Sequence, residues 1–256
     1  MAKKISADTD TQARVGKAIE NLHNALADAT ALMQSLTDND EGQELAASGT
    51  AQSSTIDFDN AFTPLSLEEM ADGEDEALLR ELGARHHLEF AIERLIALRN
   101  ERYPQSRPRY WGIVNFDLHS SKPRLFVLDL AERDTKSYLC AHGKGSEGPT
   151  DDGYANVFSN VEDSNASSLG IYRCAETYQS TKNGYSLCLD GLEETNSRAR
   201  SRYIVMHGAD YVSEAFAKKY GRIGRSEGCP ALDRQYSTKI IDQMKQGSFL
   251  LHWKSP

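Results

Sequence analysis

The sequence predicts a mainly β domain, a small barrel or sandwich with accessory helices, preceded by an α-helical and partly flexible N-terminal region. Two observations support this division. Residues 1–105 hold 20 acidic and 9 basic residues, a net charge of −11, whereas residues 106–256 hold 18 acidic and 20 basic residues. In addition, apolar residues recur at helical spacing before Tyr110 and at a spacing near two after it.

The composition of the whole chain disfavours several classes of protein. The 256 residues contain no run of the roughly 20 apolar residues that a membrane helix needs, so we expect no transmembrane segment. The first ten residues lack the apolar core of a Sec signal peptide. Cys occurs too rarely for a disulfide scaffold, and a net charge of −9 disfavours a nucleic-acid partner.

An amphipathic helix is predicted within residues 1–36. Its apolar stripe recurs every three or four positions: Val15, Ile19, Leu22, Leu26, Ala29, Met33 and Leu36. The stripe fits either a helix that folds back on its own chain or a docking helix for a partner. Residues 37–63 follow as an acidic flexible linker, because their polar composition offers little to bury.

Residues 64–105 are predicted to be helical. Ser66 and Glu69 have the spacing of a capping box, and the apolar pattern behind them predicts a helix in which Gly73 is a candidate interruption. A further helix is expected from about residue 85 to residue 102, with Pro104 beyond its end.

Residues 106–256 are predicted to form the β domain, because short β-branched or aromatic runs alternate with turn residues there. Strands are expected at 111–116, 124–130, 137–142, 170–174, 185–190, 203–207 and 248–253. Asn183-Gly184 is a tight-turn dipeptide, which predicts a hairpin between the fourth and fifth of these strands. Two helices are expected late in the chain, at about 213–220 and 233–246.

Residues with catalytic potential concentrate between positions 203 and 232. A strand that ends in His207 and Gly208 precedes a glycine-punctuated loop that holds Cys229. A nucleophilic cysteine needs a base to take its proton and donors for the developing oxyanion, which His207 and the loop amides can supply. A Cys and a His so far apart in sequence are more often packing residues, so the spacing alone leaves both interpretations open.

Several motifs of this domain together carry a resemblance to a known family. They include Ala141-His-Gly-Lys-Gly-Ser146, Ser164-Asn-Ala-Ser-Ser-Leu-Gly170, Val205-Met-His-Gly-Ala-Asp-Tyr-Val212 and Gly221-Arg-Ile-Gly-Arg-Ser-Glu-Gly-Cys-Pro-Ala-Leu232. With them the chain resembles L,D-transpeptidases of the YkuD type, and more narrowly the murein L,D-transpeptidase catalytic-domain subfamily. The resemblance covers about residues 109–256 and implies a β-rich, barrel-like sandwich.

The resemblance also implies roles for individual residues. Cys229 resembles the family's nucleophile and His207 the base that takes its proton. Either the Gly208 carbonyl or the Ser226 hydroxyl would orient the imidazole, and the amides of Gly228 and Cys229 would form the oxyanion hole.

Two positions depart from the broader family's pattern. Glu227 stands where the family has His, and Ala231 stands where it has Arg. Recognition of a substrate carboxylate must therefore come from another residue, and we predict Arg225. His142 is either a second substrate-binding residue or a structural hydrogen-bonding residue.

The remaining cysteines are expected to be small buried residues. Cys140, Cys174 and Cys188 lie in predicted strands. A disulfide between Cys174 and Cys188, which flank the hairpin, is a less favoured alternative.

The implied activity is that of a cysteine enzyme acting on the tetrapeptide stems of peptidoglycan through a thioester acyl-enzyme, without cofactor or metal. Transfer to an amine would make it an L,D-transpeptidase, and transfer to water an L,D-carboxypeptidase. A metal-dependent hydrolase using His142, Cys140 and His207 is disfavoured, because no short ligand spacing accompanies them. A non-catalytic wall-binding module is disfavoured by the intact Cys229 and His207.

The expected site of action is the periplasm or cell envelope. With no Sec signal in the sequence, either a trimmed chain or delivery by a secretion system would explain how the enzyme reaches the wall. An ordinary wall-remodelling enzyme and an antibacterial effector acting on a competitor's peptidoglycan both stay open. In the second case the helix within residues 1–36 would bind a secretion or immunity partner.

Overall fold

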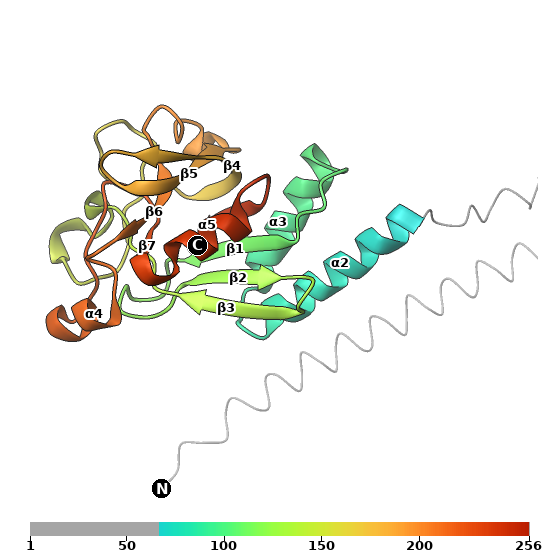
Figure 1. The fold of residues 1–256 in the computed structure, drawn as a ribbon, viewed down its shortest axis with the longest axis horizontal. Helices are drawn as coiled ribbons and strands as arrows, with labels where there is room; N and C mark the ends of the chain where they lie inside the picture. The colour runs from blue at the N-terminus through green and yellow to red at the C-terminus, as the bar shows by residue number, and fades with distance from the viewer. Residues whose placement is uncertain (1–66, 256) are drawn as a thin grey trace, which may run out of the picture. The chain divides into compact units, whose positions relative to one another are not determined.

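The structure, a computed structural model, describes residues 67–255 (Figure 1). The helix expected within residues 1–36 and the linker expected at 37–63 lie outside the described residues. Residues from Thr63 onward belong to one compact unit, which contains both the predicted helical segment and the predicted β domain. No helix in the described part has the length and apolar character needed to cross a membrane.

Eight strands form one sheet in the order β3-β2-β1-β8-β4-β5-β6-β7 (Figure 1). The strands are β1 (Tyr110–Asn115), β2 (Leu125–Asp129), β3 (Asp134–Tyr138), β4 (Gly170–Ser180), β5 (Gly184–Gly191), β6 (Val205–Ala209), β7 (Ala231–Asp233) and β8 (Phe249–Trp253). The pairs β1–β8 and β6–β7 are parallel, and the other neighbours are antiparallel. Just after β3, an isolated bridge joins Cys140 to Leu232 of β7. The two ends of the sheet thereby meet, so the predicted barrel or sandwich is confirmed in a nearly closed form.

The predicted hairpin is also confirmed, because β4 and β5 pair antiparallel across the Asn183-Gly184 turn. Gly184 has a φ of +71°, a conformation that favours glycine. The bounds of three strands differ from the prediction by two or more residues at an end, and β7 was not predicted. β6, expected at 203–207, runs from Val205 to Ala209. β4 continues to Ser180 through polar residues that carry little β signal, and its pairing with β5 shifts at a bulge between Cys174 and Thr177. The regular strand expected at 137–142 ends at Tyr138, since the chain there turns toward β7.

The interior of the sheet is filled by side chains from its strands and from α5 (Arg234–Met244). Ile240, Ile241 and Met244 of that helix are fully buried. The helix begins at Asp233, whose carboxylate accepts a hydrogen bond from the Gln235 N–H at 2.9 Å. A shorter helix, α4 (Glu214–Tyr220), follows β6, and three 3₁₀ turns lie at Lys144–Ser146, Gly148–Thr150 and Glu194–Asn196.

Two helices, α2 (Leu67–Ala84) and α3 (Glu89–Arg102), cover the outer face of the sheet. Along β1, Trp111 and Ile113 belong to this outer core while Val114 belongs to the interior, as the period of two requires. α2 runs without a break through Gly73, so the candidate interruption there was wrong. α3 begins four residues later than expected, because the chain from Ala84 to Leu88 forms the turn between the helices.

The outer core matters for the predicted domain boundary at residue 105, because it joins α2 and α3 to the sheet. The boundary itself stays a prediction. Removal of α2 and α3 would expose the apolar residues that they cover. On the sheet these are Trp111, Ile113, Phe126, Leu128, Ile171, Phe249 and Leu251. We therefore expect residues 106–256 alone to be less stable than residues 63–256.

Candidate active site

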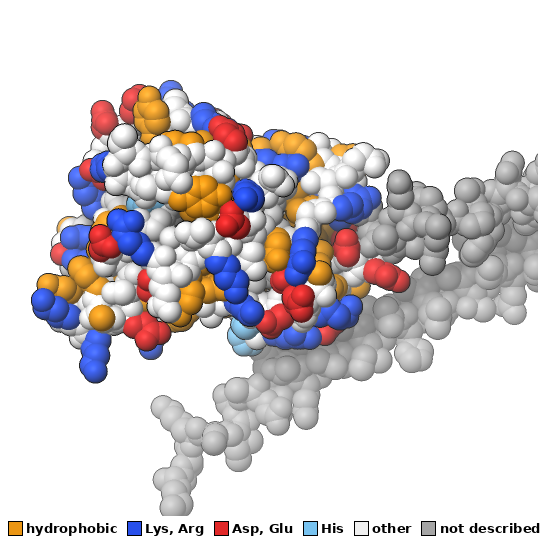
Figure 2. All heavy atoms as spheres, viewed as in Figure 1, with side chains coloured by type: hydrophobic (Ala, Val, Ile, Leu, Met, Phe, Trp, Pro, Cys, Tyr) orange, Lys and Arg blue, Asp and Glu red, His pale blue; other side chains and the backbone are white. Residues whose placement is uncertain are grey.

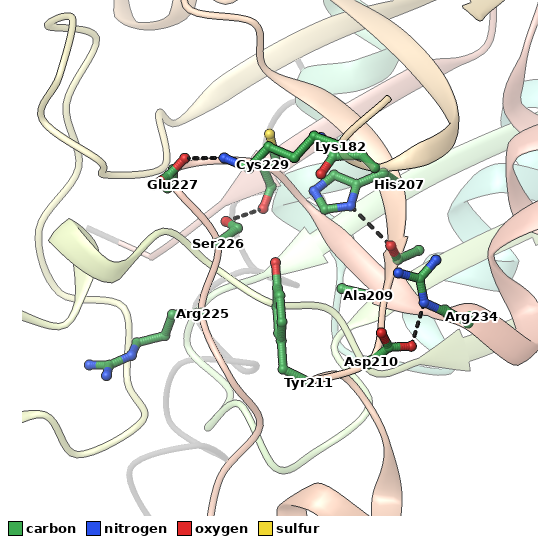
Figure 3. Close-up of a pocket in the computed structure, with 12 residues that line it drawn as sticks. Lys182, His207, Ala209, Asp210, Tyr211, Arg225, Ser226, Glu227, Cys229 and Arg234 are labelled. Carbon is green, nitrogen blue, oxygen red and sulfur yellow. Dashed lines mark hydrogen bonds and ion pairs between the residues drawn. The ribbon is translucent and has the colours of Figure 1, made fainter. Parts of the chain in front are cut away.

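A cavity of about 370 Å³ lies where β6, the loop before β7 and the tip of the β4–β5 hairpin meet (Figure 3). It is lined by Lys182, Asn183, His207, Gly208, Ala209, Asp210, Tyr211, Arg225, Ser226, Glu227, Cys229 and Arg234. The predicted nucleophile and the predicted base therefore share one cavity. The face of the molecule shown in Figure 2 intersperses basic and acidic side chains over the described residues.

The fold brings His207 and Cys229 together through the parallel pair β6–β7. In that pair His207 lies opposite Ala231, and Cys229 precedes β7 by two residues. The intervening chain contains α4 and crosses from one strand to the other. A separation of 22 positions in sequence thus becomes proximity at one end of two neighbouring strands.

The His207 side chain is oriented by the backbone of its own strand. Its Nδ1 lies 3.2 Å from the Gly208 carbonyl oxygen, which can only accept a hydrogen bond, so Nδ1 carries the proton. The lone pair of Nε2 is then left for the cavity. Burial lowers the pKa of His207, and the nearby charges of Arg234 and Lys182 act in the same direction, against the hydrogen bond to Gly208. The imidazole is therefore neutral at neutral pH.

The Cys229 thiol is buried and contacts the backbone at the start of β6. The Val205 N–H donates to the sulfur at 3.5 Å, and the thiol donates to the Tyr203 carbonyl at 3.6 Å. Burial raises the pKa of Cys229, opposed by the Val205 N–H and by the charges of Lys182 and Arg202. At neutral pH the cavity therefore holds a neutral thiol and a neutral imidazole, so a nucleophilic Cys229 would have to lose its proton as it attacks.

The Ser226 hydroxyl shapes the loop that carries Cys229. It donates to the Cys229 carbonyl at 2.6 Å and accepts a hydrogen bond from the Gly228 N–H at 3.1 Å. Of the two groups expected to orient His207, the Gly208 carbonyl is thus the one in contact. The Gly228 N–H is already in use in the loop, whereas the Cys229 N–H makes no hydrogen bond within residues 67–255.

Gly228 is the residue that this loop conformation requires. Its φ is +118°, a region that side chains with a Cβ rarely adopt. A Cβ at this position would also lie 2.9 Å from the Ala166 carbonyl oxygen and 2.9 Å from the Ile204 side chain. A glycine here is therefore needed twice, for its backbone angle and for its size.

His142 does not reach the cavity, because its side chain is fully buried. Arg124 donates to its Nδ1 at 2.6 Å, so Nε2 carries the proton and donates to Glu147 at 3.1 Å. Burial and the charge of Arg124 lower the pKa of His142 to about 3. The geometry therefore favours a structural hydrogen-bonding role for His142 over a substrate-binding role.

Arg225 lines the cavity, but its guanidinium is directed away from Cys229 (Figure 3). It donates to Glu147 at 2.8 Å and also pairs with Asp151, which in turn pairs with Arg222 at 3.0 Å. These contacts tie the 3₁₀ turns after β3 to the loop before Cys229. One nitrogen of the predicted carboxylate-binding residue, Nη1 of Arg225, is thus already paired with two carboxylates.

Several side chains of the cavity were missed in the sequence. Tyr211 directs its phenol toward Ser226 in Figure 3, and burial raises the pKa of this phenol to about 12. Arg234 pairs with Asp210, and Lys182 extends from the hairpin tip toward Glu227. The only sequence signal that could have pointed to Lys182 is its place next to the predicted Asn183-Gly184 turn. No spacing rule predicts that this turn contacts the loop of Glu227, 45 positions later.

All four cysteines lie in the described part, and none is in a disulfide. Cys140 and Cys174 are fully buried, which raises the pKa of each to about 12. Cys188 is partly exposed, and burial also raises its pKa. Cys229 lines one cavity together with His207, which makes it the candidate nucleophile by geometry as well as by motif.

The profile of the L,D-transpeptidase catalytic domain family matches residues 84–253. The chain belongs to this family. The match includes α3 and ends with the last strand, so the family's domain comprises the whole eight-stranded sheet. No curated protein sequence matches the chain.

Solved structures similar to the chain include three bacterial L,D-transpeptidases. The one from Mycobacterium smegmatis is 10% identical over 57% of this chain and 58% of its own, with a TM-score of 0.34. One from Mycobacterium tuberculosis H37Rv is 15% identical over 57% and 58%, with a TM-score of 0.34. The one from Stackebrandtia nassauensis is 15% identical over 70% and 78%, with a TM-score of 0.35. The match thus spans under two thirds of the first two of these chains.

Proposed function

We propose that this protein is a cysteine acyltransferase that acts on the tetrapeptide stems of peptidoglycan, by L,D-transpeptidation or by L,D-carboxypeptidase hydrolysis. Membership of the L,D-transpeptidase family supports the substrate class. The observation that carries the proposal is the free Nε2 of His207 in the cavity that holds the Cys229 thiol. The corresponding place of action is the cell envelope.

In the first half-reaction, His207 Nε2 takes the proton of the Cys229 thiol while the sulfur attacks the carbonyl carbon of the third stem residue. The Cys229 N–H, which has no other partner among the described residues, is positioned to donate to the resulting oxyanion. Collapse breaks the amide bond, and the leaving amine of the terminal D-amino acid receives the proton from His207. A thioester remains on Cys229.

In the second half-reaction, an amine or a water molecule attacks the thioester. His207 takes a proton from the attacking group, and Cys229 leaves as the thiol. An amine from a second stem yields a cross-link, a free D-amino acid yields an exchanged stem, and water yields a tripeptide. Both the acyltransferase and the hydrolase outcomes use the same residues.

A wall-remodelling role and an effector role remain two proposals with the same chemistry. The effector alternative depends on a secretion or immunity partner for the helix expected within residues 1–36, which lies outside the described residues. The described residues favour neither role, since both need only the cavity of Cys229 and His207.

Purified muropeptides, incubated with the protein and analysed by mass spectrometry, test this proposal. Tetrapeptide stems should lose their terminal D-Ala, or exchange it when another D-amino acid is added. Cys229→Ala should abolish both products, and Cys188→Ala serves as the matched control, because that thiol is partly exposed but lies outside the cavity. Cleavage between L-Ala and D-Glu or within the glycan would contradict the family's bond specificity, and turnover by Cys229→Ala would contradict the assigned nucleophile.

A further inference from the structure

The cavity lacks the positive charge that the broader family's motif would place after the nucleophile. Ala231 occupies that position and is fully buried in β7, where no charged side chain reaches the cavity. The second departure, Glu227, is exposed on the rim of the cavity. A substrate that ends in a carboxylate beside the attacked bond needs a cation close to Cys229, and the other basic residues of the cavity are the candidates.

Two of these candidates are occupied by buried or local partners. Arg225 is held by Glu147 and Asp151 and points away from Cys229 (Figure 3). Arg234 is paired with Asp210. In Figure 3 the Arg234–Asp210 pair lies beyond His207 as seen from Cys229.

A third cation near Cys229, Arg202, is used inside the fold. Its guanidinium donates to the carbonyls of Ser159 and Ala166 at 2.9 and 2.7 Å and to two serine hydroxyls. These contacts hold the loop before β4 against the turn before β6, and the residue does not line the cavity. Arg202 is therefore a structural residue.

Lys182 differs from Arg225 and Arg202 in having no buried partner among the described residues, and from Arg234 in lying on the Cys229 side of the cavity. Its ammonium lies 2.8 Å from Glu227, and the two side chains are 74% and 58% exposed. Figure 3 shows it reaching over from the hairpin toward Glu227, on the side of the cavity where Cys229 lies. Its charge lowers the pKa of both Cys229 and His207.

The partner of Lys182 is also one that a substrate can replace. An ion pair exposed to this extent contributes little to stability, so its opening costs little free energy. Glu227 keeps a second cation when Lys182 leaves, because Lys144 lies 3.6 Å from its carboxylate. The Glu227 carboxylate thus keeps Lys182 near the cavity through an ion pair that a substrate carboxylate can replace.

We propose that the Lys182 ammonium binds the terminal carboxylate of the stem's fourth residue, exchanging Glu227 for the substrate. The inference rests on the proposed function and adds the residue that would select stems ending at the fourth residue. A carboxylate two bonds beyond the scissile amide would then lie next to the thiol while the carbonyl is attacked. A stem with a fifth residue would carry its carboxylate past Lys182, and would be a poorer substrate.

The test compares a synthetic tetrapeptide stem with its C-terminal carboxamide. Wild-type protein should favour the free acid in kcat/KM by about tenfold or more, as expected for a lost hydrogen bond between charged groups. In Lys182→Met the two substrates should become nearly equal, mainly through KM of the acid, and Lys182→Arg should restore the preference. Glu227→Gln should raise kcat/KM for the acid several-fold and leave the carboxamide unchanged, because the competing carboxylate is gone.

Lys144→Met is the matched control, since Lys144 pairs with the same glutamate but does not line the catalytic cavity. It should leave the ratio of acid to carboxamide unchanged. An equal loss for both substrates in Lys182→Met would overturn the proposal, and so would a ratio that collapses in Arg225→Met instead.

Binding to the inactive Cys229→Ala variant separates this proposal from the proposed function. Calorimetric affinities for the acid and the carboxamide should differ in this background, and the difference should vanish when Lys182→Met is added. If this holds while wild-type protein turns over neither substrate, Lys182 binds the carboxylate and the proposed reaction is wrong. Equal affinities in the Lys182-containing protein would overturn the assignment of Lys182.

Discussion

The inner and outer walls of the cavity are built from different kinds of interaction. On the inner wall, His207, Ser226 and Cys229 are buried and are fixed by backbone groups of β6 and of the loop before β7. On the outer wall, Lys182 and Glu227 are mostly exposed and are held only by each other and by Lys144. Chemistry that requires fixed geometry lies on the first wall, and contacts that a substrate can replace lie on the second.

The difference means that the contact that orients the base does not depend on the side chains of the outer wall. A base whose partner is the Gly208 carbonyl keeps its orientation whatever side chains stand on the rim. Substitution of the family's His by Glu227 therefore leaves the arrangement of His207 and Cys229 unaffected. The cation that recognises the substrate can then come from an element far away in sequence, such as the β4–β5 hairpin.

The largest effect is expected when the inner wall loses one of its reacting groups. His207→Ala should reduce kcat/KM by about 10⁴-fold, almost as much as Cys229→Ala, because nucleophile and base act as one unit. The double variant should be no worse than Cys229→Ala alone. Steady-state release of D-Ala measures all three, with circular dichroism as the check on folding. Independent, multiplying losses would show that His207 is not the base for Cys229.

A second prediction concerns the backbone of the inner wall. Gly228→Ala should reduce kcat/KM by about 10- to 100-fold and the free energy of unfolding by about 1–3 kcal/mol, because φ of +118° and the Ala166 carbonyl both oppose a Cβ. Gly221→Ala is the matched control, since its φ is +77° and no atom lies within 4 Å of the added Cβ. That control should lose a similar or smaller amount of stability and keep its activity.

Denaturant unfolding and D-Ala release, measured on both variants, decide between the two outcomes. An active Gly228→Ala protein would mean that the loop tolerates another conformation. A loss of activity in Gly221→Ala would instead show that strain anywhere near α4 disturbs the site.

Most of the fold and the inner wall were predictable because both depend on short-range signals. Alternation at Trp111–Val114 and the Asn183-Gly184 turn identify strands and a hairpin from neighbouring residues alone. The motif around Cys229 and the strand ending in His207 led to two residues that the structure brings into one cavity. The choice of the Gly208 carbonyl over the Ser226 hydroxyl required coordinates, because both groups adjoin the site in sequence and only geometry separates them.

The outer wall was not predictable, since its contacts join residues with no common sequence signal. Arg225 was predicted as the carboxylate-binding residue because Ala231 stands where the broader family has Arg. That reasoning could not reveal that Glu147, buried 78 positions earlier, occupies its guanidinium. His142 similarly lies in one of the motifs that carry the resemblance, but both of its ring nitrogens already have buried partners, Arg124 and Glu147.

A third prediction compares one substitution on the buried and on the exposed side. Glu147→Gln removes a carboxylate that is 1% exposed and holds His142 and Arg225, and should reduce the free energy of unfolding by about 3 kcal/mol. Glu227→Gln removes one that is 58% exposed and should change it by less than about 1 kcal/mol. Urea unfolding of the two variants measures the difference. Equal effects would show that burial does not separate these two carboxylates energetically.

The smallest expected effect is a shift in the pH dependence of kcat/KM when the charge of Lys182 on the outer wall is removed. Burial lowers the pKa of His207 below its ordinary value of 6.5, so the acid limb of kcat/KM should lie below pH 6.5. Activity is full above that limb and falls as the pH drops through it, because protonated His207 cannot take the proton of Cys229. Lys182→Met removes a positive charge that lowers the pKa of His207, so the limb should move to higher pH.

The same substitution should move the alkylation profile of Cys229 in the same direction, since Lys182 also lowers the pKa of that thiol. The carboxamide substrate and iodoacetamide, neither of which carries the terminal carboxylate, measure the two shifts apart from the contact between Lys182 and that carboxylate. Lys144→Met should leave both profiles in place. A limb that moves to lower pH in Lys182→Met, or an alkylation profile that moves opposite to it, would show that Lys182 does not act on the catalytic pair through its charge. The two walls would then be coupled through structure rather than through electrostatics.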